Sequence, residues 1–271
     1  MWAPPRQAAQ GCGPQASTQA LRGSHRTCAT APVEKACINH ALGNRLLKRL
    51  EPHGRQRLLA QAELVELSPS TALGEGGVAP THAYFPTSCM ISLLAPAQDG
   101  KQLNLGLTGY EGVYGGACAL GIFASAFGAV VSAAGLAWKI EADRLARHGR
   151  DHPQLVRLVS HFLYVELRQL GLQAACNHFH PVLQRLTRYL LMSQDRMRSR
   201  DLWLTHDHLA DMLGVRRAGV TEAAGQLQRL GLIHYNRGHI YITDRPALLR
   251  ASCGCYQQGR AIYRQAMGIT G

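Results

Sequence analysis

The stretch LTHDHLADMLGVRRAGVTEAAGQLQRLG, Leu204–Gly231, decides the fold of the C-terminal third of this chain. It predicts two short helices joined by a tight turn. The first follows Thr205, whose hydroxyl can cap the free amides of a first helical turn. It ends at Gly214, which suits the left-handed position after a helix, and the second covers about residues 216–230. Two helices that cross steeply over so short a turn need small or compact residues at their contact. The residues that meet this need are Ala210, Gly214 and Val220.

The residues after this helix pair predict a β-hairpin. Two β-prone runs, Leu232–Tyr235 and Ile240–Ile242, are separated by Asn-Arg-Gly-His at 236–239, and Asn and Gly between such runs are typical of a tight turn. Two helices followed by a hairpin form a winged helix, which implies duplex DNA as the partner and places the second helix in the major groove. Arg237 at the wing tip would then meet a phosphate. An ordinary helical hairpin in an unrelated core is the alternative, and the hairpin argues against it.

Charge is distributed unevenly along the 271 residues. The whole chain has a formal net charge of +12, and residues 182–271 hold 13 arginines and 6 acidic residues, a balance of +7. Between Lys101 and Lys139 there is no Lys or Arg. A basic region that coincides with a helix-turn-helix is the electrostatic footprint of duplex DNA. A solvated basic surface is the alternative wherever such a motif is lacking.

The N-terminal region and the cysteines give little evidence of a site. Residues 1–43 lack hydrophobic periodicity, which indicates a disordered extension or an upstream segment from a misplaced start, with an organelle transit peptide as the alternative. The eight cysteines show no CxxC pair and no zinc-finger spacing. Cys253-Gly254-Cys255 is a close pair with poor zinc or disulfide geometry by itself. We therefore expect buried thiols in a reducing cytoplasm, no metal and no cofactor. No apolar run reaches membrane-spanning length.

Residues 44–150 predict a roll of short antiparallel strands. Leucines around Pro52 mark two short helices, and turn signals separate the strand-like runs that follow. The expected strands are Glu63–Leu67, His82–Phe85, Met90–Ala95, Gln102–Thr108, Ala129–Ala133 and Leu136–Ile140. With the helices, this gives an α+β fold whose first domain is an antiparallel, jelly-roll-like β-roll.

A long helix is expected from Pro153, within a segment of residues 151–180. Apolar positions three and four residues apart favour a seam that pairs two subunits, because a two-fold DNA reader needs two recognition helices. The seam residues are Leu155, Leu158, Phe162, Val165, Gln169 and Leu172. The alternative is a core helix that packs on its own domain. Pro181 ends the helix and opens a winged helix-turn-helix domain, 181–252, which a tail, 253–271, follows, itself expected to be helical.

The order of roll, long helix, hinge and winged helix resembles the CRP/FNR family of bacterial transcription regulators over residues 44–256. The resemblance is carried by HAYFPTSCMISLL (82–94), GYEGVYGG (109–116), ACNHFHPVLQRLTRYLL (175–191), LTHDHLADMLGVRRAGVTEA (204–223) and GLIHYNRGHIYITDR (231–245). It implies a cyclic-nucleotide-binding-like sensor roll, a homodimer through the long helix, and a recognition helix that reads a palindromic site. RNA polymerase is a further partner that it suggests.

The resemblance also implies site residues for DNA. Arg217 falls where family members place an arginine on a guanine, Glu222 where many carry a second basic residue, and Ala218 where many carry a glutamate. The base preference should therefore differ from that of the best-known members. The expected DNA-binding residues are Thr205, His206, Arg216, Arg217, Ala218, Gly219, Thr221, Glu222 and Arg237.

The effector remains open at this point. Cyclic-nucleotide binders of this fold use an arginine to clamp the phosphate, and residues 111–131 contain no basic residue. Binding of cyclic AMP or cyclic GMP is therefore not expected. The expected effector pocket is lined by Glu111, Gly112, Gly115, Gly116 and Cys118. Two alternatives for the function of the roll remain. One is a haem or redox sensor of the same fold, and the other is an effector-binding roll that acts through protein partners. Cys12, Cys28 and Cys37 are too widely spaced for the family's iron–sulfur pattern. No motif of an enzyme active site is present.

Overall fold

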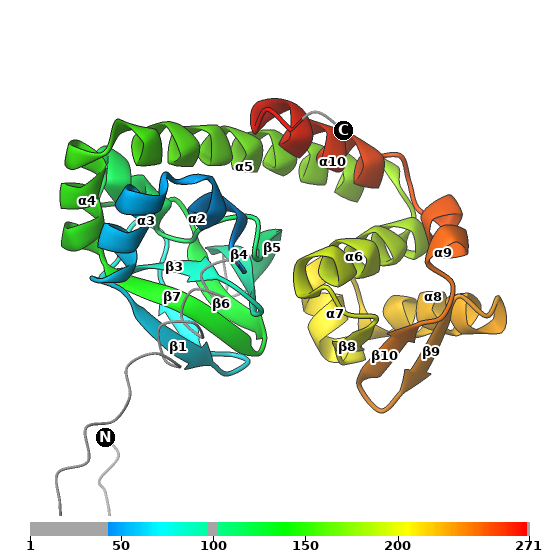
Figure 1. Cartoon of the computed structure of the whole chain (residues 1–271). Coiled ribbons are helices and arrows are strands. Elements are labelled where there is room, and N and C mark those ends of the chain that lie inside the picture. The colour runs from blue at the N-terminus through cyan, green and yellow to red at the C-terminus, as the bar shows by residue number, and fades with distance from the viewer. Residues whose placement is uncertain (1–42, 97–101, 270–271) are drawn as a thin grey trace, which may run out of the picture.

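The computed structural model describes residues 43–96 and 102–269. The expectation of a disordered extension at residues 1–43 thus lies almost wholly outside the described residues. The fold is α+β, as predicted. A roll of strands occupies one end of the molecule and a winged helix the other, and the long helix α5, Pro153–Phe179, runs along both (Figure 1). Among the described residues no helix is long and apolar enough to cross a membrane.

The roll consists of two antiparallel sheets preceded by two short helices. Helix α2, Arg45–Arg49, begins at Asn44, whose side chain accepts hydrogen bonds from the amides of Leu46 and Leu47, and α3 covers Pro52–Leu59. The sheets have the strand orders β1-β7-β3 and β2-β6-β4-β5. Their strands are β1 Glu63–Leu67, β2 Ala72–Gly74, β3 His82–Pro86, β4 Met90–Pro96, β5 Gln102–Thr108, β6 Gly128–Ala133 and β7 Gly135–Glu141.

Six of the seven strands of the roll match the predicted runs to within one residue at either end. Strand β2 was missed because three residues are too few for a periodic signal. The short 3-10 helix η2, Gly116–Leu120, follows a left-handed Gly115 with φ of 73°. Helix α4, Ala142–Asp151, then leads into α5.

Five of the six residues of the expected subunit-pairing seam on α5 are buried inside their own subunit, which is the arrangement of the alternative, a core helix that packs on its own domain. The core that they join contains residues of the roll and of the C-terminal helix. An added Cβ at Gly112 would lie 2.0 Å from Phe162 Cζ, so the Phe162 ring packs directly on the roll. The buried residues are Leu155, Leu158, Phe162, Val165 and Leu172, and Gln169 borders two cavities of the same subunit.

The C-terminal third has the predicted winged-helix order, and its three strands form one sheet, β8-β10-β9. Its elements are α6 Val182–Met197, β8 Asp201–Trp203, α7 His206–Leu213, α8 Arg217–Arg229, β9 Ile233–Asn236, β10 His239–Ile242 and α9 Arg245–Ala251. Helix α10, Cys255–Ala266, then turns back and lies along the C-terminal half of α5 (Figure 1).

Polar contacts at Met212 and Arg196 join the winged helix to the roll. The Met212 sulfur of α7 accepts a hydrogen bond from Asn104 Nδ2 of β5 at 3.0 Å. The Arg196 guanidinium of α6 meets Glu111 at 3.0 Å and also donates to the Leu107 carbonyl. Both members of this ion pair are nearly buried. Removal of either partner would leave an uncompensated buried charge.

Candidate nucleic-acid interface

The helix-turn-helix has the local geometry that its sequence predicts. Thr205 caps α7, since its hydroxyl accepts a hydrogen bond from the His208 amide at 3.1 Å. Gly214 ends α7 in the left-handed region with φ of 61°, where a side chain would be strained. The amide of Val215 donates to the Ala210 carbonyl and closes the turn. Ala210 and Val220 are both buried at the contact, so the small-residue requirement is met.

Helix α8 presents a polar face to solvent. Arg216, at the N-cap position, and Arg217, at the first helical residue, are both exposed. Arg217 Nε lies 3.3 Å from Asp207 Oδ1, and both side chains are about two-thirds exposed (67% and 68%). An ion pair in water contributes little stability, so Arg217 is free to exchange this carboxylate for another partner. Ala218, Thr221 and Glu222 are exposed on the same helix, and Gly219 is half-buried.

The wing is a two-residue hairpin with Arg237 at its tip. His239 pairs with Asn236, and Arg237 and Gly238 have φ of 45° and 85°. Two successive positive φ values define the turn that matches the twist of paired strands. Arg237 is exposed. The Leu204 amide donates to the Gly238 carbonyl at 2.8 Å, which fixes the tip beside the start of α7.

His206 and Thr205 make contacts within the protein that hold α7, α8 and the wing in place. The His206 ring stacks on Tyr235 of the wing, with centroids 4.1 Å apart. Its Nδ1 is 3.0 Å from Thr221 Oγ1, and the Thr221 hydroxyl also donates to the Arg217 carbonyl. Burial, with a further contribution from the Arg217 charge, lowers the pKa of His206, so this ring is held neutral. Thr205 serves as a helix cap.

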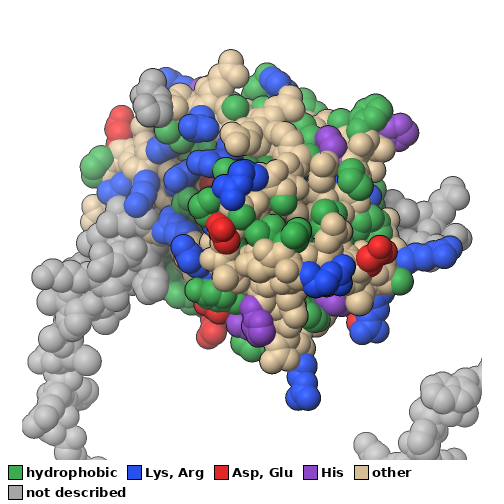
Figure 2. Space-filling model, turned by 90° about the vertical axis from the view of Figure 1, so that its right-hand side faces the viewer, with side chains coloured by type: hydrophobic (Ala, Val, Ile, Leu, Met, Phe, Trp, Pro, Cys, Tyr) green, Lys and Arg blue, Asp and Glu red, His purple; other side chains and the backbone are tan. Residues whose placement is uncertain are grey.

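An exposed tryptophan next to the wing was missed by the sequence reasoning. Trp203 of β8 is 75% exposed, and its ring lies 4.8 Å from that of His239. The same histidine is 3.0 Å from Asp201. The signal available in the sequence was an aromatic residue directly before the first helix. This signal does not show whether Trp203 is exposed, because successive side chains of a strand point alternately to the core and to solvent. Figure 2 views this end of the molecule, where many Lys and Arg side chains and few Asp or Glu side chains are seen.

The expected effector pocket is not one pocket. Glu111 lies between α5, α6 and α10, beside a cavity of about 260 Å³ that several arginines also border. Gly112 contacts Phe162 in the core, and Cys118 is fully buried. Gly115 and Gly116 border a different cavity, so the structure keeps only these two glycines together. Residues near in sequence diverge here because the chain turns sharply at Gly115.

The cavity beside Gly115 and Gly116 has a volume of about 320 Å³ and a mostly apolar lining. It lies between the roll and α5. Glu166 is the one charged residue among its described lining residues. Burial and, to a lesser extent, the like charge of Glu111 raise the pKa of Glu166 to about 8, although Thr108 donates a hydrogen bond to this carboxylate. An anion in this cavity would meet no positive partner from its described lining.

Comparison with known proteins agrees with this geometry. Residues 184–251 match the Crp-like helix-turn-helix domain. A sequence comparison with curated proteins finds no match. Among solved structures, the fold is similar to that of CLP, a c-di-GMP-responsive global regulator from Xanthomonas campestris, at 18% identity, with 72% of this chain and 100% of that chain covered and a TM-score of 0.58. FixK2 from Bradyrhizobium japonicum is similar at 14% identity, with coverages of 71% and 98% and a TM-score of 0.59. A CRP/FNR-family regulator from Eubacterium rectale is similar at 15% identity, with coverages of 78% and 98% and a TM-score of 0.58.

Proposed function

We propose that this chain, which carries a Crp-like helix-turn-helix domain on the fold of the CRP/FNR regulators, is a sequence-specific DNA-binding transcription regulator. The observation that carries the proposal is the exposed start of α8, where Arg216 and Arg217 stand beside the arginine-tipped wing. An arginine near the start of such a helix can donate two hydrogen bonds to guanine. The wing arginine is suited to a phosphate, which positions the protein on any sequence.

We further propose that it acts as a homodimer on a palindromic site, through a face of α5 that its own subunit leaves uncovered. Leu167 is 65% exposed and Tyr164 49% exposed. The uncovered residues recur at alternating steps of four and three, as in a coiled-coil seam. They are Leu167 and Ala174, which are exposed, and Val156, Ser160, Leu163 and Leu170, which are half-buried. The residues of this stripe lie one or two positions after those of the buried face, which is about 100–200° around the helix.

The effector that fits this fold best is a small, mostly apolar molecule in the cavity beside Gly115 and Gly116. Three residues of the uncovered stripe, Leu163, Leu167 and Leu170, also line that cavity. A ligand there would contact the face through which we propose that the subunits pair. Cyclic AMP and cyclic GMP are poor candidates, because a desolvated phosphate without a positive partner is strongly unfavourable.

The test is a selection of duplex sequences by the full-length protein and by Arg217→Ala. We expect Arg217→Ala to lose about 1–3 kcal/mol of discrimination at one base pair of each half-site. Arg237→Ala should lower affinity for all sequences and reduce the slope of log affinity against log salt by roughly 1. Arg150→Ala, an exposed arginine of α4 at the opposite end of the molecule, is the matched control. If Arg217→Ala selects the same sequence as the unmodified protein, the base-reading role fails.

A further inference from the structure

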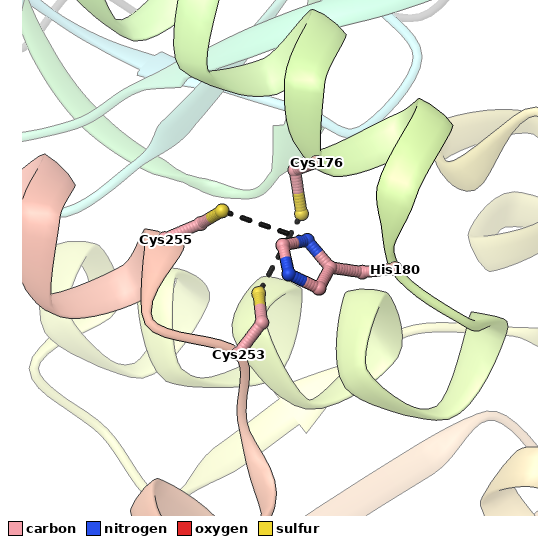
Figure 3. Close-up of side chains that lie close together, drawn as sticks. All are labelled: Cys176, His180, Cys253 and Cys255. Carbon is pink, nitrogen blue, oxygen red and sulfur yellow. Dashed lines mark hydrogen bonds between the residues drawn. The ribbon is translucent and has the colours of Figure 1, made fainter.

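Four metal-ligating side chains meet where the C-terminal segment returns to α5. Cys176 lies in the last turn of α5, and His180 caps the end of that helix. Cys253 and Cys255 flank Gly254 on the other segment, where Cys255 begins α10. The three cysteines are buried and His180 is partly buried. The side chains of all four residues point toward one another (Figure 3). One ligand atom from each lies within 4.8 Å of every other.

The distances within this cluster fit a single ion. The Cys176 and Cys253 sulfurs are 3.6 Å apart, and the Cys255 sulfur is 3.6 Å from His180 Nδ1. A tetrahedral zinc ion with ordinary bond lengths holds two sulfurs about 3.8 Å apart, and a sulfur and a nitrogen about 3.5 Å apart. An iron–sulfur cluster would bind the four side chains through several irons and spread the ligand atoms farther apart.

The cluster is unlike the other buried thiols of the chain. Cys89 and Cys118 are fully buried in hydrophobic cores, as structural cysteines commonly are. Cys118 shares its core with the three cysteines of the cluster but does not belong to the cluster. Among the described residues, Cys176, His180, Cys253 and Cys255 form the one group of three or more His, Cys, Asp or Glu side chains placed to hold a metal ion. A hydrophobic core gains nothing from an imidazole, whereas three sulfurs and one nitrogen form a common structural zinc ligand set.

We propose that Cys176, His180, Cys253 and Cys255 bind one structural Zn²⁺ ion. Four protein ligands fill the tetrahedron, so the site leaves no position for a substrate. On binding, three thiols release their protons to solvent, and the ion with three thiolates and a neutral imidazole carries a net charge of −1. Arg188, which is buried and borders the same cavity as Cys255, offers a positive charge nearby.

The ion would link the end of α5 to the segment that leads into α10. His180 caps the C-terminus of α5 and directly precedes Pro181, where the chain enters the winged-helix domain. Cys253 and Cys255 precede and begin α10, which packs along α5. Zinc would therefore tie α10 to the end of α5 and fix the direction in which the chain leaves toward α6. Any effect on DNA affinity rests on the proposed function, whereas the metal site itself does not.

The experiment measures metal in the reduced full-length protein. We expect one zinc per chain by elemental analysis, and, after exchange, the visible spectrum of tetrahedral cobalt with thiolate ligands. Cys253→Ser should lose most of the bound metal. His180→Cys should keep one cobalt ion and strengthen the sulfur-to-metal charge-transfer band, which shows that position 180 is a ligand even if other variants fold poorly.

Two matched controls separate this site from other thiols. Cys89→Ser and a triple replacement of Cys12, Cys28 and Cys37 by Ser should both retain one metal ion per chain. A reduced unmodified protein that binds neither zinc nor cobalt would overturn the proposal. So would loss of metal in the triple variant with retention in Cys253→Ser. Because the readout is metal content and spectrum, it is independent of whether the protein binds the selected DNA.

Discussion

Two faces of helix α5 carry the same spacing of apolar residues but have different surroundings. One face, which includes Phe162 and Val165, is covered by the roll and α10 of its own subunit. The other, which includes Leu167 and Leu170, borders the cavity between the roll and α5 and is less covered, since Leu167 is 65% exposed. Apolar residues spaced three and four apart therefore identify a helix with a buried face. They do not show whether that face packs on its own subunit or on a second one.

The difference between the faces lies in their neighbours, not in their composition. Gly112 and Gly116 of the roll let the chain approach α5 closely. A Cβ at Gly116 would lie 3.2 Å from Val159 Cγ1, just as one at Gly112 would collide with Phe162. Among the described residues, no glycine makes a comparably close contact with Leu167. Three predictions, ordered by their effect on the stability of a subunit, separate the two faces.

The largest effect should come from Phe162→Ala on the covered face. The ring is 3% exposed and packs on Gly112, so its removal loses buried apolar surface and leaves a cavity. We expect the free energy of unfolding to fall by about 3–5 kcal/mol. Urea denaturation followed by circular dichroism measures this loss. The control is Leu167→Ala. Its free energy of unfolding, extrapolated to dilute protein so that subunit pairing does not contribute, should differ from that of the unmodified protein by no more than about 0.5 kcal/mol.

A smaller effect, with a distinct pH dependence, should come from Glu166→Gln between the two faces. The folded protein raises the pKa of Glu166 to about 8, so the unfolded chain ionises first as pH rises. Below the unfolded pKa of 4.5, Glu166 is protonated in both states and does not reduce the free energy of unfolding. As pH rises from 4.5 to about 8, the free energy of unfolding falls because only the unfolded chain ionises. Above about pH 8 it levels off. Glutamine should remove this fall and add roughly 1–3 kcal/mol at pH 8.

Denaturation midpoints across this pH range test the second prediction. The unmodified protein and Glu166→Gln should unfold alike near pH 4, and the variant should become more stable as pH increases. Thr108→Val, which removes the hydrogen bond to the carboxylate, should leave the stability fall in place. Parallel pH curves for the unmodified protein and Glu166→Gln would mean that folding does not raise the pKa of Glu166.

The winged helix could be predicted because its signals are local. Thr205 caps the helix that it precedes, and Gly214 ends the same helix nine residues later. The strands of the roll were found for the same reason, since alternation and turn residues lie within each run. The faces of α5 could not be assigned, because the choice depends on Gly112 and Gly116, some fifty residues away in the chain.

The cysteine and histidine cluster was out of reach for a related reason. Cys253 and Cys255 alone have one residue between them, which is too close for a recognised zinc pattern. Cys176 and His180 lie four apart on a helix, a spacing that a buried helix commonly shows by chance. The two pairs are more than seventy residues apart, and the fold of α10 onto α5 brings them together. The residues of the expected effector pocket show the opposite relation, since they are neighbours in sequence but only Gly115 and Gly116 border the same cavity.

The smallest effect on a single subunit, and the largest on assembly, should come from Leu167→Glu on the uncovered face. A carboxylate at an exposed position costs the isolated subunit no more than about 0.5 kcal/mol. In a subunit interface the same charge would be desolvated without a partner, which is strongly unfavourable. We expect sedimentation to show monomers at concentrations where the unmodified protein is dimeric, and the unfolding midpoint to lose its dependence on protein concentration. His161→Glu adds the same charge at an exposed position of α5 outside the stripe and should leave the dimer intact. A Leu167→Glu protein that remains dimeric would move the pairing surface away from this face of α5. The two faces would then differ only in which one the subunit covers.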